Sequence, residues 1–258
     1  GQHSDEVSML KEERQQNILN ILRQNGKVVA TELSHELGVS EDTIRRDLDE
    51  LAQKGSLQRV HGGGLPHSPA STDYRMRMEQ NTAVKSAIAA AAVKHLTPGQ
   101  VIFLDGGTTN LQAARLIPAE FVGTLVTNSP AIAAALCCLP QAEVICVGGR
   151  LDKTDQVVTG AVAEGFVRSL QLDVLLLGVC SLHPQAGITV PNLEEASLKR
   201  ALIERANRGI ALASADKLGT AAAFQVAPLD SLDVLITNRD DSVDMQPYRD
   251  NKIAIEWV

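Results

Sequence analysis

From residue 101 to the C-terminus, short apolar runs alternate with stretches of helical periodicity. The strand candidates are 101–104, 125–127, 144–147, 172–178, 210–213, 234–237 and 253–258. Helical stretches lie between most of them, including 83–95, 129–136, 162–170 and 194–207. Strands that alternate with helices form a mainly parallel sheet covered on both faces, so this part of the chain is predicted to be an α/β domain.

The length and composition favour two domains of unequal size. At 258 residues the chain is too long for one average domain, and its aromatic content of 3% describes a protein rich in Ala, Val and Leu. No apolar run approaches the roughly 20 residues that a membrane span needs. Residues 1–8 lack the cationic start and apolar stretch of a secretory signal. We therefore expect a cytoplasmic protein.

The four cysteines do not have the spacing of a metal site. Cys137, Cys138, Cys146 and Cys180 form no CxxC pair, and no His stands at ligand spacing from them. We expect no metal, no cofactor and reduced, buried thiols. Cys180 follows a strand candidate, but no recognisable motif arranges a general base around it, so we expect it to be inert.

Three short helices are predicted before residue 55. The first spans 11–24 and is terminated by Gly26, and the second starts with Thr31 as its N-cap and ends at Gly38. The third follows Ser40 as its N-cap. Their apolar residues recur at helical spacing: Ile18, Ile21 and Leu22, then Leu33 and Leu37, then Ile44, Leu48 and Leu51. Two helices thus meet across a tight turn.

A hairpin and a linker are expected after these helices. Residues 56–61 alternate, with Leu57 and Val60 as inward positions, until the glycine run 62–64 breaks the pattern. The stretch 66–80 starts with prolines, serines and Thr72, and the composition shifts after it from balanced charge to Ala, Val and Leu. We therefore expect an N-terminal domain at 1–65, a linker at 66–80 and an α/β domain at 81–258.

The third helix has the side chains that a DNA-reading helix requires. With Ile44 and Leu48 buried, its polar residues, including Asp47, lie away from the core, where they can meet base edges and phosphates. A solvated charged face is the alternative for this helix alone. With the hairpin as a wing on the backbone, the predicted DNA-binding residues are Ser40, Glu41, Thr43, Arg45, Arg46, Arg59 and His61.

The charge of the chain limits how it can bind DNA. The net charge is −7, and through Pro66 the acidic residues outnumber the basic ones, 11 to 8. Any contact with DNA must therefore be made by a local patch. The same acidity leaves open a winged helix that binds another protein, although Arg45, Arg46 and Arg59 cluster on the elements that would meet DNA.

Polar residues and glycines follow several strand candidates. The sequence Asp-Gly-Gly-Thr-Thr at 105–109 lies where a strand turns into a helix, so backbone N–H groups and hydroxyls can converge on an anion there. A tight turn capped by Thr is the simpler interpretation of this motif alone. Other strand ends contribute Asn128, Ser129, Gly148, Gly149 and Gly178, and ligands gather at the carboxyl ends of parallel strands.

Charged residues near these strand ends suit a sugar phosphate. Lys85, Lys199 and Lys217 can neutralise a phosphate, whereas Asp105, Glu195 and Asp216 can bind sugar hydroxyls or orient the lysines. Each of them alone is more often part of a surface ion pair. Arg150 is equally a phosphate clamp or a solvated loop residue.

The order of these motifs resembles the DeoR family of bacterial transcription regulators. Residues 13–14, 39–48 and 59–63 are similar to its winged helix-turn-helix. Behind them, Arg77, Asn81 and Lys85 stand at the family's linker spacing. The further motifs that match are 105–109, 127–129, 148–149, Gly160, Gly178, Gly187, Glu195 with Lys199, and 216–217. The resemblance covers nearly the whole chain.

The resemblance implies a DNA-binding regulator, most often a repressor, of a carbohydrate operon. Its partners would be operator DNA and a phosphorylated sugar, and a homo-oligomer, dimer or tetramer, would hold two recognition helices ~34 Å apart. It implies an α/β domain similar to ribose-5-phosphate isomerase and the CoA-transferases. The expected effector residues are Asp105, Gly106, Gly107, Thr108, Thr109, Asn128, Ser129, Gly148, Gly149, Glu195, Lys199, Asp216 and Lys217.

The main rival to a regulator is an isomerase-like enzyme with an accessory winged helix. Glu195 would then be one of two groups that transfer protons. The strand end at 177–181 reads Leu-Gly-Val-Cys-Ser and has no carboxylate, so half of the acid–base pair is missing. Binding without turnover, and therefore no enzymatic activity, fits the sequence better.

Overall fold

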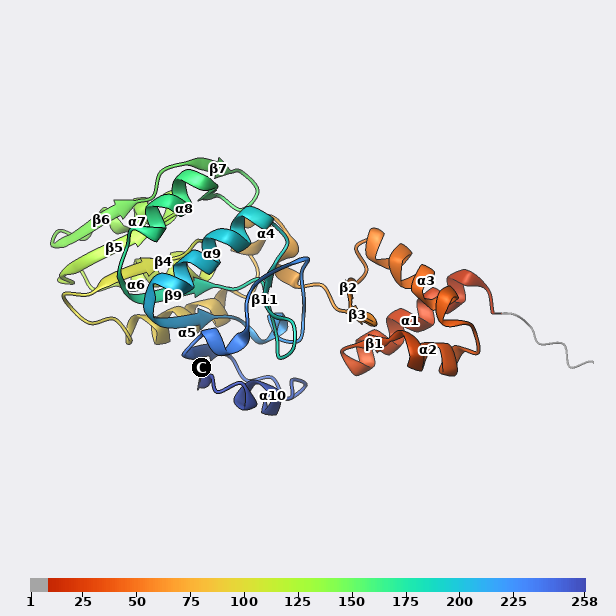
Figure 1. Ribbon diagram of the computed structural model, residues 1–258. Helices are drawn as coiled ribbons and strands as arrows, with labels where there is room; N and C mark the ends of the chain where they lie inside the picture. The colour runs from red at the N-terminus through yellow and green to blue at the C-terminus, as the bar shows by residue number, and fades with distance from the viewer. Residues whose placement is uncertain (1–8) are drawn as a thin grey trace, which may run out of the picture. The chain divides into compact units, whose positions relative to one another are not determined.

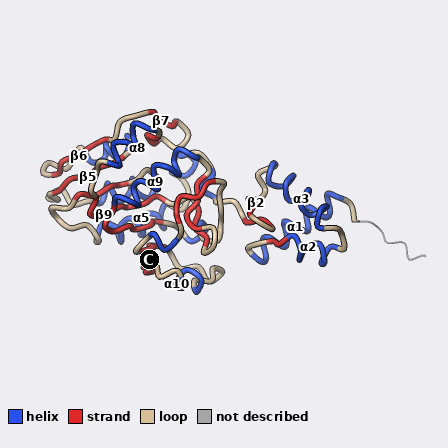
Figure 2. The backbone as a smooth tube through the Cα atoms, viewed as in Figure 1, coloured by secondary structure: helices blue, strands red, loops and turns tan. Residues whose placement is uncertain are grey.

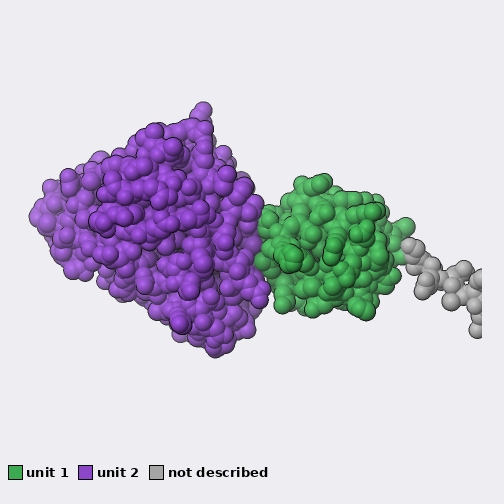
Figure 3. Space-filling view, viewed as in Figure 1, with its two compact units in different colours: residues 1–67 green, residues 68–258 purple. Residues whose placement is uncertain are grey.

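The computed structural model describes residues 9–258, so the expectation that residues 1–8 are not a secretory signal lies outside the described residues. The chain divides between His67 and Ser68 into two compact units, which Figure 3 colours separately. Each unit has its own hydrophobic core, so each is described by itself below.

The first unit is a winged helix-turn-helix, as the sequence predicts. Its elements are α1 (Lys11–Asn25), β1 (Val28–Val29), α2 (Ala30–Leu37), α3 (Glu41–Gln53), β2 (Gln58–Val60) and β3 (Gly63–Leu65) (Figure 1). Ile18, Leu33, Ile44 and Leu48 meet in its core with at most 1% of their surface exposed. The strands pair antiparallel in the order β1-β3-β2, and β2 and β3 form the wing.

Two local predictions for this unit are wrong, both because of strand pairing. Thr31 is not an N-cap, since α2 already begins at Ala30, whose N–H donates to Gly62 O at 2.8 Å. The glycine run does not end the hairpin either. Gly63 belongs to the central strand β3, where a Cβ would lie 1.9 Å from Val28 O, so only glycine permits this close pairing.

A buried ion pair joins the first and third helices. Asp47 was expected to face away from the core, but it is only 2% exposed and forms an ion pair with Arg14 Nε at 2.5 Å. Gln15 Nε2 donates to the same carboxylate at 3.2 Å. Asp47 therefore fixes α1 against α3 and is not available to DNA, so its placement on the outer face is wrong.

Replacing Asp47 by Asn should lower the free energy of unfolding of the first unit by about 1.5–3 kcal/mol. The amide keeps the shape but loses the charge-assisted hydrogen bonds from Arg14. Urea unfolding followed by far-UV circular dichroism measures the change. Asp42→Asn is the matched control, because the Asp42–Arg46 pair is exposed and is worth about 0.3–0.5 kcal/mol. Equal effects of the two variants would refute a structural role for the buried pair.

The second unit is built on a seven-stranded sheet in which all neighbouring strands are parallel. The strand order is β15-β14-β12-β9-β4-β5-β6 (Figure 2). The strands are β4 (Val101–Leu104), β5 (Gly123–Thr127), β6 (Ala142–Cys146), β9 (Leu172–Gly178), β12 (Ala206–Leu212), β14 (Val234–Thr237) and β15 (Ala254–Trp257). The predicted fold class, a winged helix-turn-helix joined to a larger α/β domain with a mainly parallel sheet, is confirmed.

Helices cover both faces of this sheet. The helices are α4 (Tyr74–Met78), α5 (Thr82–Val93), α6 (Thr108–Leu116), α7 (Pro130–Leu136), α8 (Ala161–Arg168), α9 (Leu193–Arg205) and α10 (Gln246–Asp250), with 3-10 turns η1 (Pro69–Ser71), η2 (Ala215–Lys217) and η3 (Leu229–Ser231). Val174 and Leu176 of β9 face α5, α6 and α7, whereas Leu175 and Leu177 face α8 and α9. Alternate side chains of β9 therefore pack into two apolar layers, one on each face of the sheet.

Two small antiparallel sheets were not predicted. One pairs β7 (Arg150–Asp152) with β8 (Val157–Thr159), and the other has the order β10-β11-β13, with β10 (Ser181–His183), β11 (Gly187–Val190) and β13 (Phe224–Ala227). The first small sheet is the β7–β8 hairpin. It matters for the site, because its turn carries side chains to the carboxyl end of β4.

The expectation of buried thiols is wrong for three cysteines. Cys137 and Cys138 follow α7, Cys146 ends the edge strand β6, and all three are exposed and free. Cys180 is half-buried, and burial raises the pKa of its thiol. Within residues 9–258, no helix has both the length and the apolar character to cross a membrane.

Candidate functional site

The strand order reverses direction between β4 and β9. From β4 the sheet grows through β5 to β6, and from β9 it grows through β12 to β15. At such a reversal the connections leave toward opposite faces and open a crevice at the carboxyl ends of the strands. A pocket lies there, and most of the predicted effector residues line it: Asp105, Gly106, Gly107, Thr108, Thr109, Asn128, Glu195, Lys199 and Lys217.

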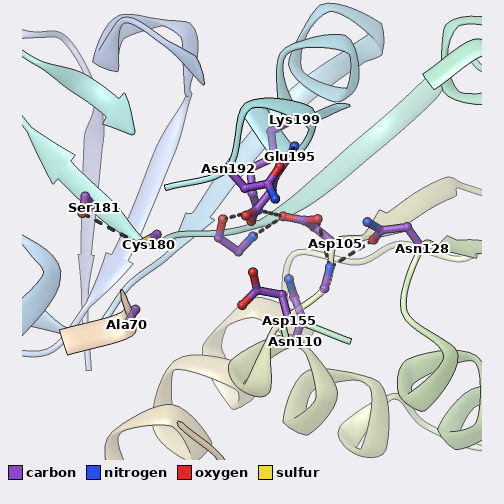
Figure 4. Close-up of polar contacts among 12 residues, drawn as sticks. Ala70, Asp105, Asn110, Asn128, Asp155, Cys180, Ser181, Asn192, Glu195 and Lys199 are labelled. Carbon is purple, nitrogen blue, oxygen red and sulfur yellow. Dashed lines mark hydrogen bonds and ion pairs between the residues drawn. The ribbon is translucent and has the colours of Figure 1, made fainter. Parts of the chain in front are cut away.

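The floor of the pocket is a buried ion pair that joins β4 to β9. Asp105 follows β4, is 2% exposed, and lies 2.5 Å from Lys199 Nζ of α9 (Figure 4). Its carboxylate also accepts from Gly106 N at 2.9 Å and from Gly178 N at 3.0 Å. Lys199 in turn donates to Gly178 O at 2.9 Å. The pair therefore links the carboxyl ends of β4 and β9.

Glu195 lies one helical turn before this lysine. Its Oε1 is 3.4 Å from Lys199 Nζ, and burial raises the pKa of Glu195 although the lysine opposes the shift. Burial also lowers the pKa of Lys199, but Asp105 and Glu195 outweigh it and raise this pKa above the usual lysine value. Lys199 is therefore a permanent cation whose charge Asp105 already compensates.

The turn after β4 presents donors to the same pocket. Gly106 must be glycine, because a Cβ there would lie 2.0 Å from Val157 Cγ1 of the β7–β8 hairpin. Its N–H donates to Asp105 and also to Asn128 Oδ1, at 3.2 Å. Helix α6 then begins at Thr108 without a side-chain cap. The N–H groups of its first turn are consequently open to an anion.

Lys217 supplies the uncompensated positive charge of the pocket. It ends η2, and in the part of the chain that the structure describes it forms no ion pair. Burial lowers the pKa of Lys217 to about 8, and the neighbouring Lys85 also lowers it. Lys85 itself is buried, does not line the pocket, and donates to the carbonyl of Arg77.

Three polar residues of the pocket were not among the predicted effector residues. Arg77 of α4 and Asp155 of the β7–β8 turn both line it, and Arg77 Nη1 lies 3.0 Å from Asp155 Oδ1. Asn110 of α6 also lines it and donates to Leu176 O at 3.0 Å. The resemblance already singled out Arg77, but nothing in the sequence marks Asp155, which lies in a polar turn.

Four predicted effector residues do not line the pocket. Ser129 caps α7 by accepting from Ile132 N at 3.3 Å, and Gly148 and Gly149 are exposed before β7. Asp216 turns away and accepts hydrogen bonds from Ser214 and Asn81. Arg150 is also solvated, 75% exposed, and paired with Glu194 at 2.5 Å. These residues serve the turns around the pocket.

The N-terminal half of α3 presents the predicted DNA-binding residues of this helix. Ser40 caps α3 by accepting from Thr43 N at 3.2 Å, and its hydroxyl lies 2.9 Å from Thr43 Oγ1. Arg45 and Arg46 are exposed, and each is paired with the acidic residue one turn earlier, Glu41 at 3.2 Å and Asp42 at 3.5 Å. The exposed face of α3 therefore alternates in charge.

The wing places two further polar side chains beside α3. Arg59 and His61 line a hollow together with Arg45. Arg59 is anchored on two sides, to Asp49 at 2.7 Å and to Gly63 O at 2.5 Å. A guanidinium held in this way is pre-oriented for a phosphate. The structure thus gathers one residue of α3 and two of the wing around one hollow.

Residues 9–258 contain no group of three or more His, Cys, Asp or Glu side chains arranged to hold a metal ion. The polar and charged groups that line the pocket can recognise a ligand by hydrogen bonds and charge. Its cationic groups, Arg77, Lys199 and Lys217, face the carboxylates of Asp105, Asp155 and Glu195.

Comparison with known proteins identifies relatives along nearly the whole chain. The chain is 37% identical to the HTH-type transcriptional regulator GlpR of Haloferax volcanii, over 89% of this chain and 91% of that protein. It is 29% identical to the glycerol-3-phosphate regulon repressor of Escherichia coli, over 96% and 99% of the two chains. Ribose 5-phosphate isomerase A from Methanocaldococcus jannaschii is a distant structural neighbour, with a TM-score of 0.40 and 15% identity over 54% of this chain and 55% of that chain.

Family models match both units. The DeoR-like helix-turn-helix domain matches residues 14–68, and the DeoR C-terminal sensor domain matches residues 80–239. The resemblance predicted from the order of the sequence motifs is confirmed. The chain belongs to the DeoR family of transcription regulators.

Proposed function

We propose that this regulator represses a carbohydrate-metabolism operon and that a phosphorylated sugar in the pocket of the second unit controls its affinity for operator DNA. The observation that carries the proposal is that hydrogen-bond donors suited to a phosphate converge in one pocket. The first turn of α6 and Lys217 belong to different strand connections, yet both line this pocket. The names of relatives, among them a glycerol-3-phosphate regulon repressor, support the same ligand class.

The phosphate would bind between α6 and η2. The N–H groups of the first turn, the hydroxyls of Thr108 and Thr109, and the ammonium of Lys217 supply hydrogen bonds of the kind that phosphate oxygens accept. Lys199 cannot replace Lys217 in this role, because the carboxylate of Asp105 already neutralises its charge.

The sugar would lie toward the acidic side of the same pocket. Asp155 and Glu195 line it, and carboxylate oxygens are strong acceptors for hydroxyl groups. Asp155 uses only Oδ1 for Arg77, so its second oxygen is available to a hydroxyl. A phosphate end and a hydroxyl end within one pocket select a phosphorylated polyol over free phosphate.

On the DNA side, α3 would enter the major groove with Ser40, Glu41, Thr43, Arg45 and Arg46, while Arg59 and His61 of the wing contact the backbone. A homo-oligomer would place two such helices on a repeated site, about one DNA turn apart. Bacterial operator DNA lies in the cytoplasm, and we propose the same location for the protein.

An isomerase is the second candidate, because Glu195 lies in the pocket with a raised pKa, which suits a general acid or base. The second carboxylate of an acid–base pair is missing at the end of β9, and the neighbouring Asp105 forms an ion pair with Lys199. Incubation with ribose 5-phosphate and a colorimetric assay for ribulose 5-phosphate tests the candidate. Turnover that Glu195→Gln abolishes would replace the sensor by an enzyme.

The proposed ligand class is tested with glycerol 3-phosphate, ribose 5-phosphate, glucose 6-phosphate and inorganic phosphate. We expect at least one phosphorylated polyol to raise the melting temperature and to change the Kd for DNA selected by the protein from a random library. Lys217→Met should weaken binding of that ligand by about 2–5 kcal/mol, or roughly 30-fold or more, because it removes a half-buried charge beside the phosphate. Calorimetric titration measures the loss.

The pH dependence of ligand affinity distinguishes the charge of Lys217 from the shape of its side chain. Because the pKa of Lys217 is about 8, the wild type should lose affinity roughly tenfold per pH unit above 8, as its ammonium loses the proton that the phosphate needs. Lys217→Met should show no such slope. Lys94→Met, at an exposed lysine, is the control and should bind as the wild type does. Stabilisation only by an unphosphorylated sugar or a CoA thioester would contradict the ligand class.

A further inference from the structure

The fourteen or so residues that follow the winged helix-turn-helix unit in the chain form part of the pocket wall. We call Ser68–Asn81 the connecting segment; it contains η1 and α4 and ends at the N-cap of α5. Ala70 and Arg77 of this segment line the pocket. The backbone that leads from the DNA-binding unit into the sensor unit is therefore in direct contact with the ligand site.

Three anchors hold the connecting segment to the pocket. The buried Ser68 Oγ donates to Cys180 O, Tyr74 N donates to Thr154 O at 3.0 Å, and Asn81 Nδ2 donates to Asp216 Oδ2 at 2.9 Å. Each acceptor is a pocket residue or the immediate neighbour of one, because Cys180, Asp155 and Lys217 line the pocket. Three separate parts of the wall thus fix the segment.

Arg77 makes the fourth and most direct connection. Its Nη1 donates to Ala70 O at 3.1 Å and to Thr72 O at 2.7 Å, both in the segment, and to Asp155 Oδ1 across the pocket wall. Within residues 9–258, Nε and Nη2 of this guanidinium have no hydrogen-bond partner. One nitrogen therefore folds the segment, while the remaining donors are left for a ligand.

We propose that the connecting segment is the coupling element of this regulator, and that Arg77 reports pocket occupancy to it. The inference rests on the proposed function, since it takes a phosphorylated ligand in the pocket as the signal. A ligand whose oxygens engage the open donors of Arg77 draws the guanidinium away from Asp155 and the two carbonyls, or tightens its hold on them. Either change alters the stability of the fold at Ser68–Thr72, where the chain leaves for the DNA-binding unit.

The anchor at Ser68 offers a test that leaves the pocket intact. Ser68 does not line the pocket, so Ser68→Ala removes the hydrogen bond to Cys180 O without removing a ligand contact. The coupling ratio is the Kd for library-selected DNA without ligand divided by that with saturating ligand. For the wild type we expect a ratio that departs from one by about 5–150-fold in either direction. In Ser68→Ala the coupling ratio should move at least threefold closer to one. The Kd for the ligand should stay within about twofold of the wild-type value.

A matched serine supplies the control. Ser169 Oγ also donates to a backbone carbonyl, that of Phe166 at 2.6 Å, but at the C-cap of α8 and outside the segment. Ser169→Ala should keep the wild-type coupling ratio. The ligand used is whichever of glycerol 3-phosphate, ribose 5-phosphate and glucose 6-phosphate most stabilises the wild type. A Ser68→Ala variant with full coupling would overturn the inference and leave the proposed ligand class standing.

Hydrogen exchange on the full-length wild-type chain gives a second readout that needs no variant. The amides of residues 68–81 should change their exchange rate at least threefold when the ligand saturates, whereas those of β14 should not. Unchanged exchange in 68–81 with clear ligand binding contradicts the coupling role. If no phosphorylated compound stabilises the wild type or alters its DNA binding, the proposed function fails, and the inference fails with it.

Discussion

Replacing both Arg45 and Arg46 by Ala should weaken binding to operator DNA at least about 30-fold without unfolding the protein. Each arginine is exposed on the first half of α3, where it can reach a base edge or a phosphate, and each such contact is worth about 1–3 kcal/mol. Within residues 9–258 of the DNA-free protein, their ion-pair partners are acidic side chains one turn away, in pairs worth about 0.3–0.5 kcal/mol. Loss of binding would therefore not reflect loss of the fold.

Fluorescence anisotropy with library-selected DNA measures this effect, and circular dichroism confirms the helical content. Arg23→Ala is the control, because Arg23 is exposed on α1 and bonded within its own helix. The slope of log Kd against log salt should fall in magnitude by about one for each phosphate contact that is removed. An unaltered Kd in the double variant would show that α3 is not the recognition helix.

Replacing Lys199 by Met should destabilise the second unit by about 3–5 kcal/mol. The variant keeps much of the side-chain volume but leaves the carboxylate of Asp105 buried without its counter-ion. Trp257, the only tryptophan of the chain, lies in β15 of the same sheet, so its fluorescence during urea unfolding follows this unit.

The double variant Asp105→Asn, Lys199→Met distinguishes the unpaired charge from a packing defect. It should recover at least half of the loss, because a neutral amide is much less costly to bury than an unpaired carboxylate. Arg168→Met serves as the surface control, since Arg168 pairs with Glu164 and Glu204 in contact with solvent and should cost at most about 1 kcal/mol. A change of less than 1 kcal/mol in Lys199→Met would mean that the floor of the pocket is not fixed by this pair.

The central strands could be predicted closely from the sequence. β4, β9 and β14 begin and end at the predicted residues, because strands buried on both faces read as unbroken apolar runs. The strands of the two small antiparallel sheets have three or four residues each, and β7 reads Arg-Leu-Asp. Segments so short carry no periodicity, so their pairing depends on the tertiary fold.

The pocket was predictable to the extent that parallel strands bring their carboxyl ends together. Asp105, Asn128 and the turn after β4 follow from this rule. Asp155 does not, because a hairpin far along the chain delivers it, and Gly148 and Gly149 failed to reach the pocket since they begin that same hairpin. In the first unit, Asp47 looked exposed because helical periodicity alone cannot show that Arg14 of another helix covers it.

The alternating charge on α3 has a consequence for how the protein searches a genome. Glu41 and Asp42 stand beside the two arginines of α3, so this surface would gain little from releasing the counter-ions that surround any DNA. Residence on unrelated sequences would then be brief, and each molecule would sample many sites in a short time. Only a site whose base edges compensate for the acidic neighbours retains the protein.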